Sequence, residues 1–215
     1  MPKLACVSID LLGLPATCGR FRIPESDLPP AGVPAVGRRA PERYAELLDR
    51  CGAPASFFVE ADDLGDPESA HAIAALPDLG HELALLGPGG DETLAMRPPL
   101  EISAALAKGC AALSKVGREH PVGFRAAGGF LSPALLEELE AHGFLYDSSV
   151  HFGGPGGRAA LLAPRSPYRP SPRDPRRRGS AKLVELPAST AGAPGVPLSG
   201  ALLGSGPKSL AALVY

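Results

Sequence analysis

Three ionisable residues stand near the ends of apolar runs in this sequence. Asp10 closes the first run, Arg125 lies near the end of the run at 121–126, and Asp147 lies within the run at 144–150. In parallel α/β proteins the carboxyl ends of the strands converge on one face, where functional groups gather. We therefore predict that the three side chains share one mouth, with Arg125 keeping the Asp10 carboxylate ionised and oriented. A purely structural ion pair is the alternative.

A second candidate region is the stretch GHELALLGPGGDE, Gly80–Glu92, in which an apolar run opens into a glycine-rich loop. A phosphate-binding loop is disfavoured because the stretch lacks a Gly-Lys-Ser/Thr ending and a full G-x-G-x-x-G pattern. His81 is expected to be structural. A metal site built from His81, Asp91 and Glu92 is the alternative, and the remaining histidines form no cluster in the sequence.

Short apolar runs alternate with segments of helical periodicity, which is typical of an α/β fold with a mainly parallel sheet and crossover helices. The predicted strands are 4–9, 55–60, 81–86, 121–126, 144–150 and 182–188. The predicted helices are 41–52, 66–76, 99–116 and 132–143. Asp66 and Ser132, each followed by proline, are predicted N-caps, and Gly52 and Gly143 suit the left-handed position after a helix end.

The composition is that of a globular chain of 215 residues with many irregular connections, since it holds 26 Gly and 25 Pro. We expect a single domain, 1–215, with long loops at 11–40 and 151–180. The net charge of −2 gives no reason to expect nucleic acid, and the basic run Arg173–Gly179 is expected to be a solvated loop. No secretory signal or transmembrane run is apparent, which favours a cytoplasmic location.

Several motifs occur together and in order along nearly the whole chain. They are SID on the first predicted strand, LLDRCGAPASFFVEADDL, LGHE, PVGFRAAGGFLSPALLEELEAHGFLYDSS and LVELPAS. In this combination the chain resembles the polysaccharide deacetylases, which form carbohydrate esterase family four. The resemblance implies a distorted (β/α) barrel with fewer than eight strands. It also implies a catalytic site in which a divalent metal and an aspartate base hydrolyse N-acetyl groups on sugars.

The resemblance makes Asp10 the match for the family's base and Arg125 its partner. The family's metal-binding acid falls on Leu11 or Leu12, and its two metal-binding histidines fall on Leu86 and Gly90. None of these residues can supply a metal ligand, so we expect no cofactor. Zinc or another divalent metal is expected only if the site has been rebuilt.

Two further family features are absent. The family's arginine motif continues with a proline and an aromatic residue, where this chain has Ala127 and Gly129. A late histidine that serves the family as general acid is missing before the chain ends, so one expectation is a domain whose C-terminal end is incomplete.

These observations favour a polysaccharide-deacetylase-like protein of carbohydrate metabolism without metal-dependent activity, which binds carbohydrate or a protein partner. Asp147 is included as a weak substrate-binding candidate. One alternative is an active deacetylase that hydrolyses the C–N amide bonds of N-acetyl sugars with a rebuilt site. A structural or assembly protein without a ligand is the other.

Overall fold

The computed structural model describes residues 6–13, 24, 35–88, 94–150, 163–191 and 196–197. Its centre is a six-stranded sheet in the order β1-β2-β3-β4-β5-β6, and every neighbouring pair is parallel. The strands are β1 (Val7–Leu11), β2 (Ala55–Glu60), β3 (Glu82–Leu86), β4 (Gly123–Arg125), β5 (Tyr146–Asp147) and β6 (Val184–Glu185). The predicted α/β fold with one parallel sheet is confirmed.

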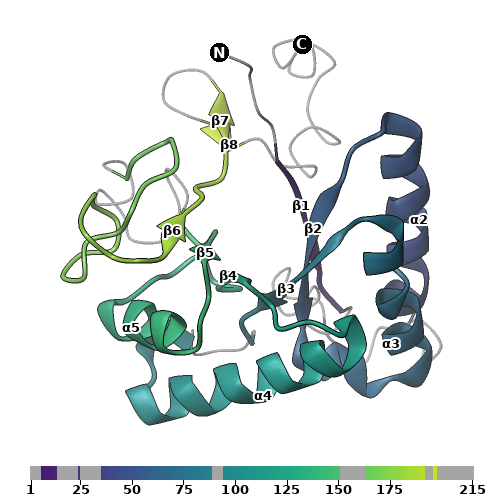
Figure 1. Ribbon diagram of the computed structural model, residues 1–215, viewed down its shortest axis with the longest axis horizontal. Coiled ribbons are helices and arrows are strands. Elements are labelled where there is room, and N and C mark those ends of the chain that lie inside the picture. Colours follow the sequence, from purple (N-terminus) through teal and green to yellow (C-terminus); the bar gives the residue numbers. More distant parts are fainter. Residues whose placement is uncertain are drawn as a thin grey trace.

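A separate antiparallel pair, β7 (Thr190–Ala191) and β8 (Val196–Pro197), was not predicted from the sequence. Four α-helices connect the strands of the main sheet. They are α2 (Ala35–Cys51), α3 (Pro67–Ala74), α4 (Pro99–Gly117) and α5 (Pro133–Ala141). Short 3-10 helices are η3 (Ala61–Gly65), η4 (Pro77–Leu79) and η5 (Leu94–Met96). The α-helices follow one another around one side of the sheet (Figure 1).

The helix ends are built as the sequence indicates. Asp66 Oδ2 accepts a hydrogen bond of 2.9 Å from the backbone of Ser69, and Ser132 Oγ accepts one of 3.1 Å from the backbone of Leu135. Each cap is followed by proline in the first helical turn, where its missing N–H costs no hydrogen bond. Gly52 adopts φ 59° in the left-handed region that favours glycine.

The predicted loop 11–40 is wrong at both ends. Leu11 belongs to β1, and α2 begins at Ala35, so that Pro41 lies inside the helix. Tertiary contacts hold the early turns: the guanidinium of Arg38 binds Asp66 Oδ1 at 2.7 Å and Glu68 Oε2 at 2.9 Å. These contacts cannot be read from local periodicity, which placed the helix start at the proline.

The fifth and sixth strands are much shorter than the predicted 144–150 and 182–188. After β5 the backbone N–H groups of Ser149 and Val150 turn to bind buried carboxylates instead of a neighbouring strand. The described part of the predicted loop 151–180 is irregular, with isolated bridges such as Pro170 to Arg178.

The two faces of the sheet have different environments. The face toward the helices belongs to the main hydrophobic core, in which Phe57 and Val59 of β2 and Phe124 of β4 are fully buried. Residues that alternate with these point to the opposite, inner face, because successive strand side chains point to opposite sides. Asp10 and Arg125 lie on this inner face, at the carboxyl ends of their strands.

No helix in the described ranges is both long and apolar enough to cross a membrane. The cytoplasmic location stays a prediction.

Candidate functional site

Asp10 and Arg125 form an ion pair at the carboxyl end of the sheet. Arg125 Nη1 donates to Asp10 Oδ1 at 2.5 Å, although the residues are 115 positions apart in the sequence. The side chain of Asp10 is 33% exposed and that of Arg125 is 16% exposed. The predicted pairing of Asp10 with Arg125 on one rim is confirmed, while its catalytic role stays a prediction.

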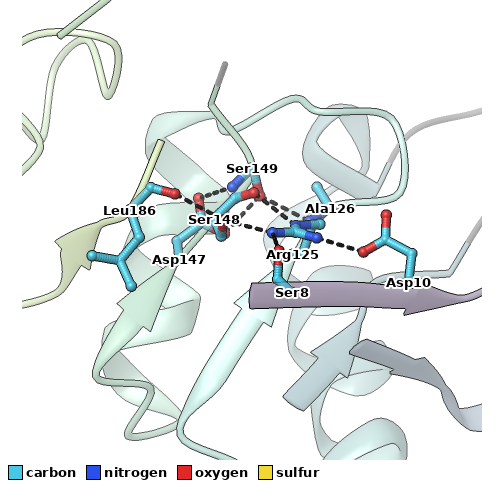
Figure 2. A network of polar contacts seen from close by, with 8 residues as sticks. All are labelled: Ser8, Asp10, Arg125, Ala126, Asp147, Ser148, Ser149 and Leu186. Atoms are coloured by element: carbon cyan, nitrogen blue, oxygen red, sulfur yellow. Dashed lines mark hydrogen bonds and ion pairs between the residues drawn. The ribbon is translucent and has the colours of Figure 1, made fainter. Parts of the chain in front are cut away.

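Arg125 is held on every side by the protein (Figure 2). Its Nε donates to the carbonyl oxygen of Ser148 at 3.0 Å, and its Nη2 donates to Ser148 Oγ at 2.8 Å and Ser8 Oγ at 2.9 Å. The guanidinium carbon lies 4.0 Å from the ring centroid of Phe58, a cation–π contact. With nearly all its donors in use, Arg125 is suited to orient Asp10 rather than to bind a ligand directly.

Only one of the two carboxylate oxygens of Asp10 is bound within the described residues. Its Oδ1 is bound by Arg125, whereas Oδ2 has no hydrogen-bond partner among the described residues. A partly exposed carboxylate with one fixed and one open oxygen can accept a hydrogen bond from a ligand hydroxyl, amide or water. Within the described residues, Asp10 is therefore the partly exposed hydrogen-bond acceptor of the ion pair.

Apolar side chains occupy the inner face beside this pair. Phe58, Ala84 and Leu86 form a small buried cluster, against which Leu12 and Tyr146 pack. Leu86 is 1% exposed and is the register partner of Arg125, so it lies immediately next to the ion pair. The inner face therefore carries an apolar cluster where the resemblance would require ligands.

The structure also distinguishes the two alternatives for the missing acid. Leu11 is 4% exposed and belongs to the main core, whereas Leu12 packs on the inner-face cluster. Leu12 is therefore the residue placed nearer the site. Neither Leu12 nor Leu86 carries a donor atom, and no group of three or more His, Cys, Asp or Glu is gathered anywhere in the described ranges. These residues do not fit a catalytic metal, which needs about three protein ligands.

His81 has a structural role. It is buried, its Nδ1 accepts a hydrogen bond from the backbone of Ala55 at 3.3 Å, and its ring packs edge-on against Phe57. It precedes β3, about 10 Å along the strand direction from the Asp10 row at ~3.3 Å per residue. His81 therefore cannot join a site at the mouth. Gly90, Asp91 and Glu92 lie outside the described residues.

The start of the glycine-rich loop is explained by packing. The backbone N–H of Gly87 donates to the carbonyl oxygen of Arg125 at 2.7 Å, which continues the β3–β4 pairing. A Cβ at this position would lie 2.9 Å from the ring of Phe124. Glycine is needed here for close approach of the chain.

The backbone conformation at Gly129 is the reason that an aromatic residue does not fit there. Gly129 adopts φ 70°, and its N–H donates to the carbonyl oxygen of Ala126 in a tight turn. A side chain larger than hydrogen would be strained in this conformation. The turn is therefore built around glycine rather than around an aromatic residue.

Asp147 does not share the mouth with the other two residues. It is fully buried, Ser149 Oγ donates to its Oδ1 at 2.6 Å, and it faces Glu185 on β6. Burial raises the pKa of Asp147 even though Ser149 and the charge of Arg125 act in the opposite direction. The predicted substrate contact is inconsistent with this position, because a ligand cannot reach the carboxyl group.

Sequence reasoning missed the residues that hold the pair in place. Ser8 and Ser148 bind Arg125, and Phe58 supports its guanidinium. Deeper on the inner face, the hydroxyls of Ser56 and Tyr146 both donate to Glu82 Oε2, at 2.5 and 2.9 Å. A period-two reading of β1 and β2 would have placed Ser8 with Asp10, and Ser56 with Phe58, on one face.

No protein-family model matches the sequence, and no curated protein is detectably similar to it. Among solved structures, a protein assigned as a polysaccharide deacetylase from Mycobacterium smegmatis superposes with a TM-score of 0.64 and 26% sequence identity. The alignment covers 86% of this chain and 58% of that protein. The fold is that of the polysaccharide deacetylases. The chain spans somewhat over half the length of this relative.

Two further matches concern the fold alone. The allantoinase PuuE superposes with a TM-score of 0.52 at 20% identity, over 71% of this chain and 45% of that one. A mutant of BA3943, a pseudoenzyme of carbohydrate esterase family four from Bacillus anthracis, gives a TM-score of 0.50 at 14% identity, over 68% and 45%. The expected distorted-barrel class is thus supported by the folds of several solved structures.

Proposed function

We propose that this polysaccharide-deacetylase-like protein binds carbohydrate at the mouth around Asp10 without metal-dependent deacetylation. The observation that carries the proposal is the apolar cluster on the inner face beside the Asp10–Arg125 pair, since Leu12 and Leu86 stand where the resemblance implies metal ligands. Water bound to a catalytic metal has its pKa lowered from about 15.7 to about 7. Without that effect, a carboxylate alone does not activate water for amide hydrolysis.

The binding role rests on what the mouth retains. Asp10 presents a carboxylate oxygen without a partner among the described residues, and Arg125 keeps the carboxylate in a fixed orientation, which suits a sugar hydroxyl or the N–H of an N-acetyl group. The protein from Mycobacterium smegmatis supports carbohydrate as the ligand class, through its assignment as a polysaccharide deacetylase. A protein partner is the alternative occupant.

Titration of the protein with a β-1,4-linked tetramer of N-acetylglucosamine, followed by calorimetry, tests this proposal. We expect saturable binding to the wild type and at least about tenfold weaker binding to Asp10→Asn, because a hydrogen bond to a charged group contributes roughly 1.5–3 kcal/mol. Glu137→Gln, which changes an exposed carboxylate on α5, is the control and should bind as the wild type does. Equal affinity for all three proteins, or no binding to any, would contradict the proposal.

A second candidate is an active hydrolase whose site is completed by residues of another molecule or of the undescribed segments. The observation that favours it is the preserved base position, since Asp10 is partly exposed and oriented as a general base needs to be. Release of acetate from the same tetramer separates the two candidates. Acetate production that Asp10→Asn abolishes would favour this second candidate over binding alone.

A further inference from the structure

Two buried acids face each other behind the candidate site. Asp147 on β5 and Glu185 on β6 are register partners in the parallel sheet, and both side chains are fully buried. Two consecutive residues, Ser149 and Val150, each donate a backbone N–H to one of the two acids, which places the carboxyl groups beside one another. Two ionised carboxylates in such a position would repel each other without water to screen them.

One carboxylate oxygen of the pair has no hydrogen-bond donor among the described residues. Asp147 accepts from Ser149, through its hydroxyl at 2.6 Å and its backbone N–H at 3.2 Å, while Glu185 Oε1 accepts from the backbone of Val150 at 2.9 Å. Glu185 Oε2 is buried and finds no donor among the described residues. A proton between the two acids supplies that missing donor.

The neighbouring groups do not supply it. The hydroxyl of Tyr168, which lies close to both acids, donates instead to the carbonyl oxygen of Pro175 at 2.8 Å. The positive charge of Arg125 on β4 acts on both acids, but its guanidinium is already bound to Asp10. Arg125 is thus shared with Asp10, and a single proton on the buried pair removes the repulsion between its two carboxylates.

We propose that Asp147 and Glu185 share one proton and that this pair positions Arg125, and through it Asp10, by holding the turn Ser148–Val150. Ser149 and Val150 in this segment donate to the two acids. Ser148, between them and β5, accepts hydrogen bonds from Arg125 at both its carbonyl oxygen and its hydroxyl oxygen. The acids are positioning residues, since neither reaches the mouth. The inference concerns the support of the site and does not depend on what the site binds.

The direction of the pKa shifts agrees with this arrangement. Burial raises the pKa of Asp147, and burial together with the neighbouring Asp147 raises that of Glu185 well above its usual range. The two groups titrate as a unit, so the shifts belong to the pair. Because the folded state retains a proton that the unfolded chain loses above about pH 4, stability falls as pH rises until the pair loses its proton.

Replacing Glu185 with glutamine tests the shared proton. The amide N–H of Glu185→Gln can donate to Asp147 in place of that proton, so the variant needs none. For the wild type, the equilibrium constant for unfolding should rise with pH above about 4.5, by up to about tenfold per unit from this pair. The part of this pH dependence that comes from the pair should disappear in Glu185→Gln and remain in the control Glu137→Gln. Identical pH profiles for all three proteins would overturn the proposal.

Two nuclear magnetic resonance measurements complete the test. The Nε–H signal of Arg125 should change with pH in the wild type, at the midpoint of the pair's deprotonation, and stay constant in Glu185→Gln. If the Asp147–Glu185 pair did not position Arg125, this Nε–H signal would not change when the pair loses its proton. If Glu185→Gln does not fold, the carboxyl carbon of Glu185 in the wild type decides: it should keep the chemical shift of a protonated acid far above the ordinary midpoint of about 4.3. Titration of both acids at ordinary values would contradict the shared proton.

Discussion

The two faces of the main sheet are formed by the same strands but carry different kinds of side chain. On the face toward the helices, Phe57, Leu85 and Phe124 pack into one continuous core. On the inner face, a small apolar cluster around Phe58 lies among charged and hydroxyl groups, and Asp10 remains partly exposed. The helix-facing core around Phe57 is explained by burial alone, whereas the inner face contains groups whose arrangement burial does not require.

This difference locates the candidate function. A buried aromatic side chain such as Phe57 contributes stability by leaving water, at roughly 25 cal/mol per Å² of apolar surface. An ion pair at the mouth contributes little by comparison, because partial exposure screens it. Several groups of the protein nevertheless bind Arg125 and fix its orientation toward Asp10, an arrangement that the small stability of this ion pair does not explain.

The largest effect is expected on the helix-facing side. Phe57→Ala should lower the free energy of unfolding by about 3–5 kcal/mol, because it leaves a cavity in a fully buried core. Chemical denaturation measures this loss. Leu47→Ala on α2, where the side chain is 52% exposed, is the control and should change stability by less than about 1 kcal/mol. Equal losses for the two variants would remove the contrast on which this description of the core rests.

An intermediate effect is expected where the inner face is most tightly packed. A Cβ at Gly123 on β4 would collide with the ring and hydroxyl of Tyr146, which would have to leave Glu82. Gly123→Ala should therefore cost about 1–3 kcal/mol in denaturation experiments. Gly65→Ala is the control, since nothing lies within 4 Å of a Cβ there. A stable Gly123→Ala protein would show that the inner face tolerates repacking.

The smallest effect is expected at the mouth itself. A double-mutant cycle on Asp10→Asn and Arg125→Met should give a coupling above about 0.5 kcal/mol, because removing one partner leaves the other charge uncompensated. The surface pair Lys108–Asp62, with both side chains about 70% exposed at a separation of 2.7 Å, is the control and should show no measurable coupling. Equal coupling energies for the two pairs would mean that the Asp10–Arg125 pair is no stronger than an ordinary surface ion pair.

The sequence was a better guide to the secondary-structure elements than to the contacts between distant elements. Apolar runs and N-caps such as Asp66 predicted six parallel strands and four helices, because local chemistry determines these features. The pairing of Asp10 with Arg125 was also predicted, from the convergence of strand ends. Strand lengths were overestimated where Ser149 and Val150 turn toward buried acids, since that contact is visible only in three dimensions.

The buried position of Asp147 was not predictable for a similar reason. Its partner Glu185 lies 38 residues further along the chain, and nothing in the sequence YDSSV indicates that the aspartate faces the interior. The serines around Arg125 were missed because hydroxyl groups are common in sequences and gain meaning only when a guanidinium is placed between them. Local pattern specifies elements, whereas the site depends on contacts between distant elements.

The central claim, that the inner face does not support metal-dependent chemistry, is tested most directly by zinc binding to the wild-type protein. Calorimetric titration with zinc should show no stoichiometric site, since Leu12 and Leu86 offer no donor atoms. The variant Leu12→Asp, Leu86→His, Gly90→His should bind zinc more tightly than the wild type. One equivalent of zinc per wild-type chain, removed by a chelator together with acetate release from the N-acetylglucosamine tetramer, would contradict the claim.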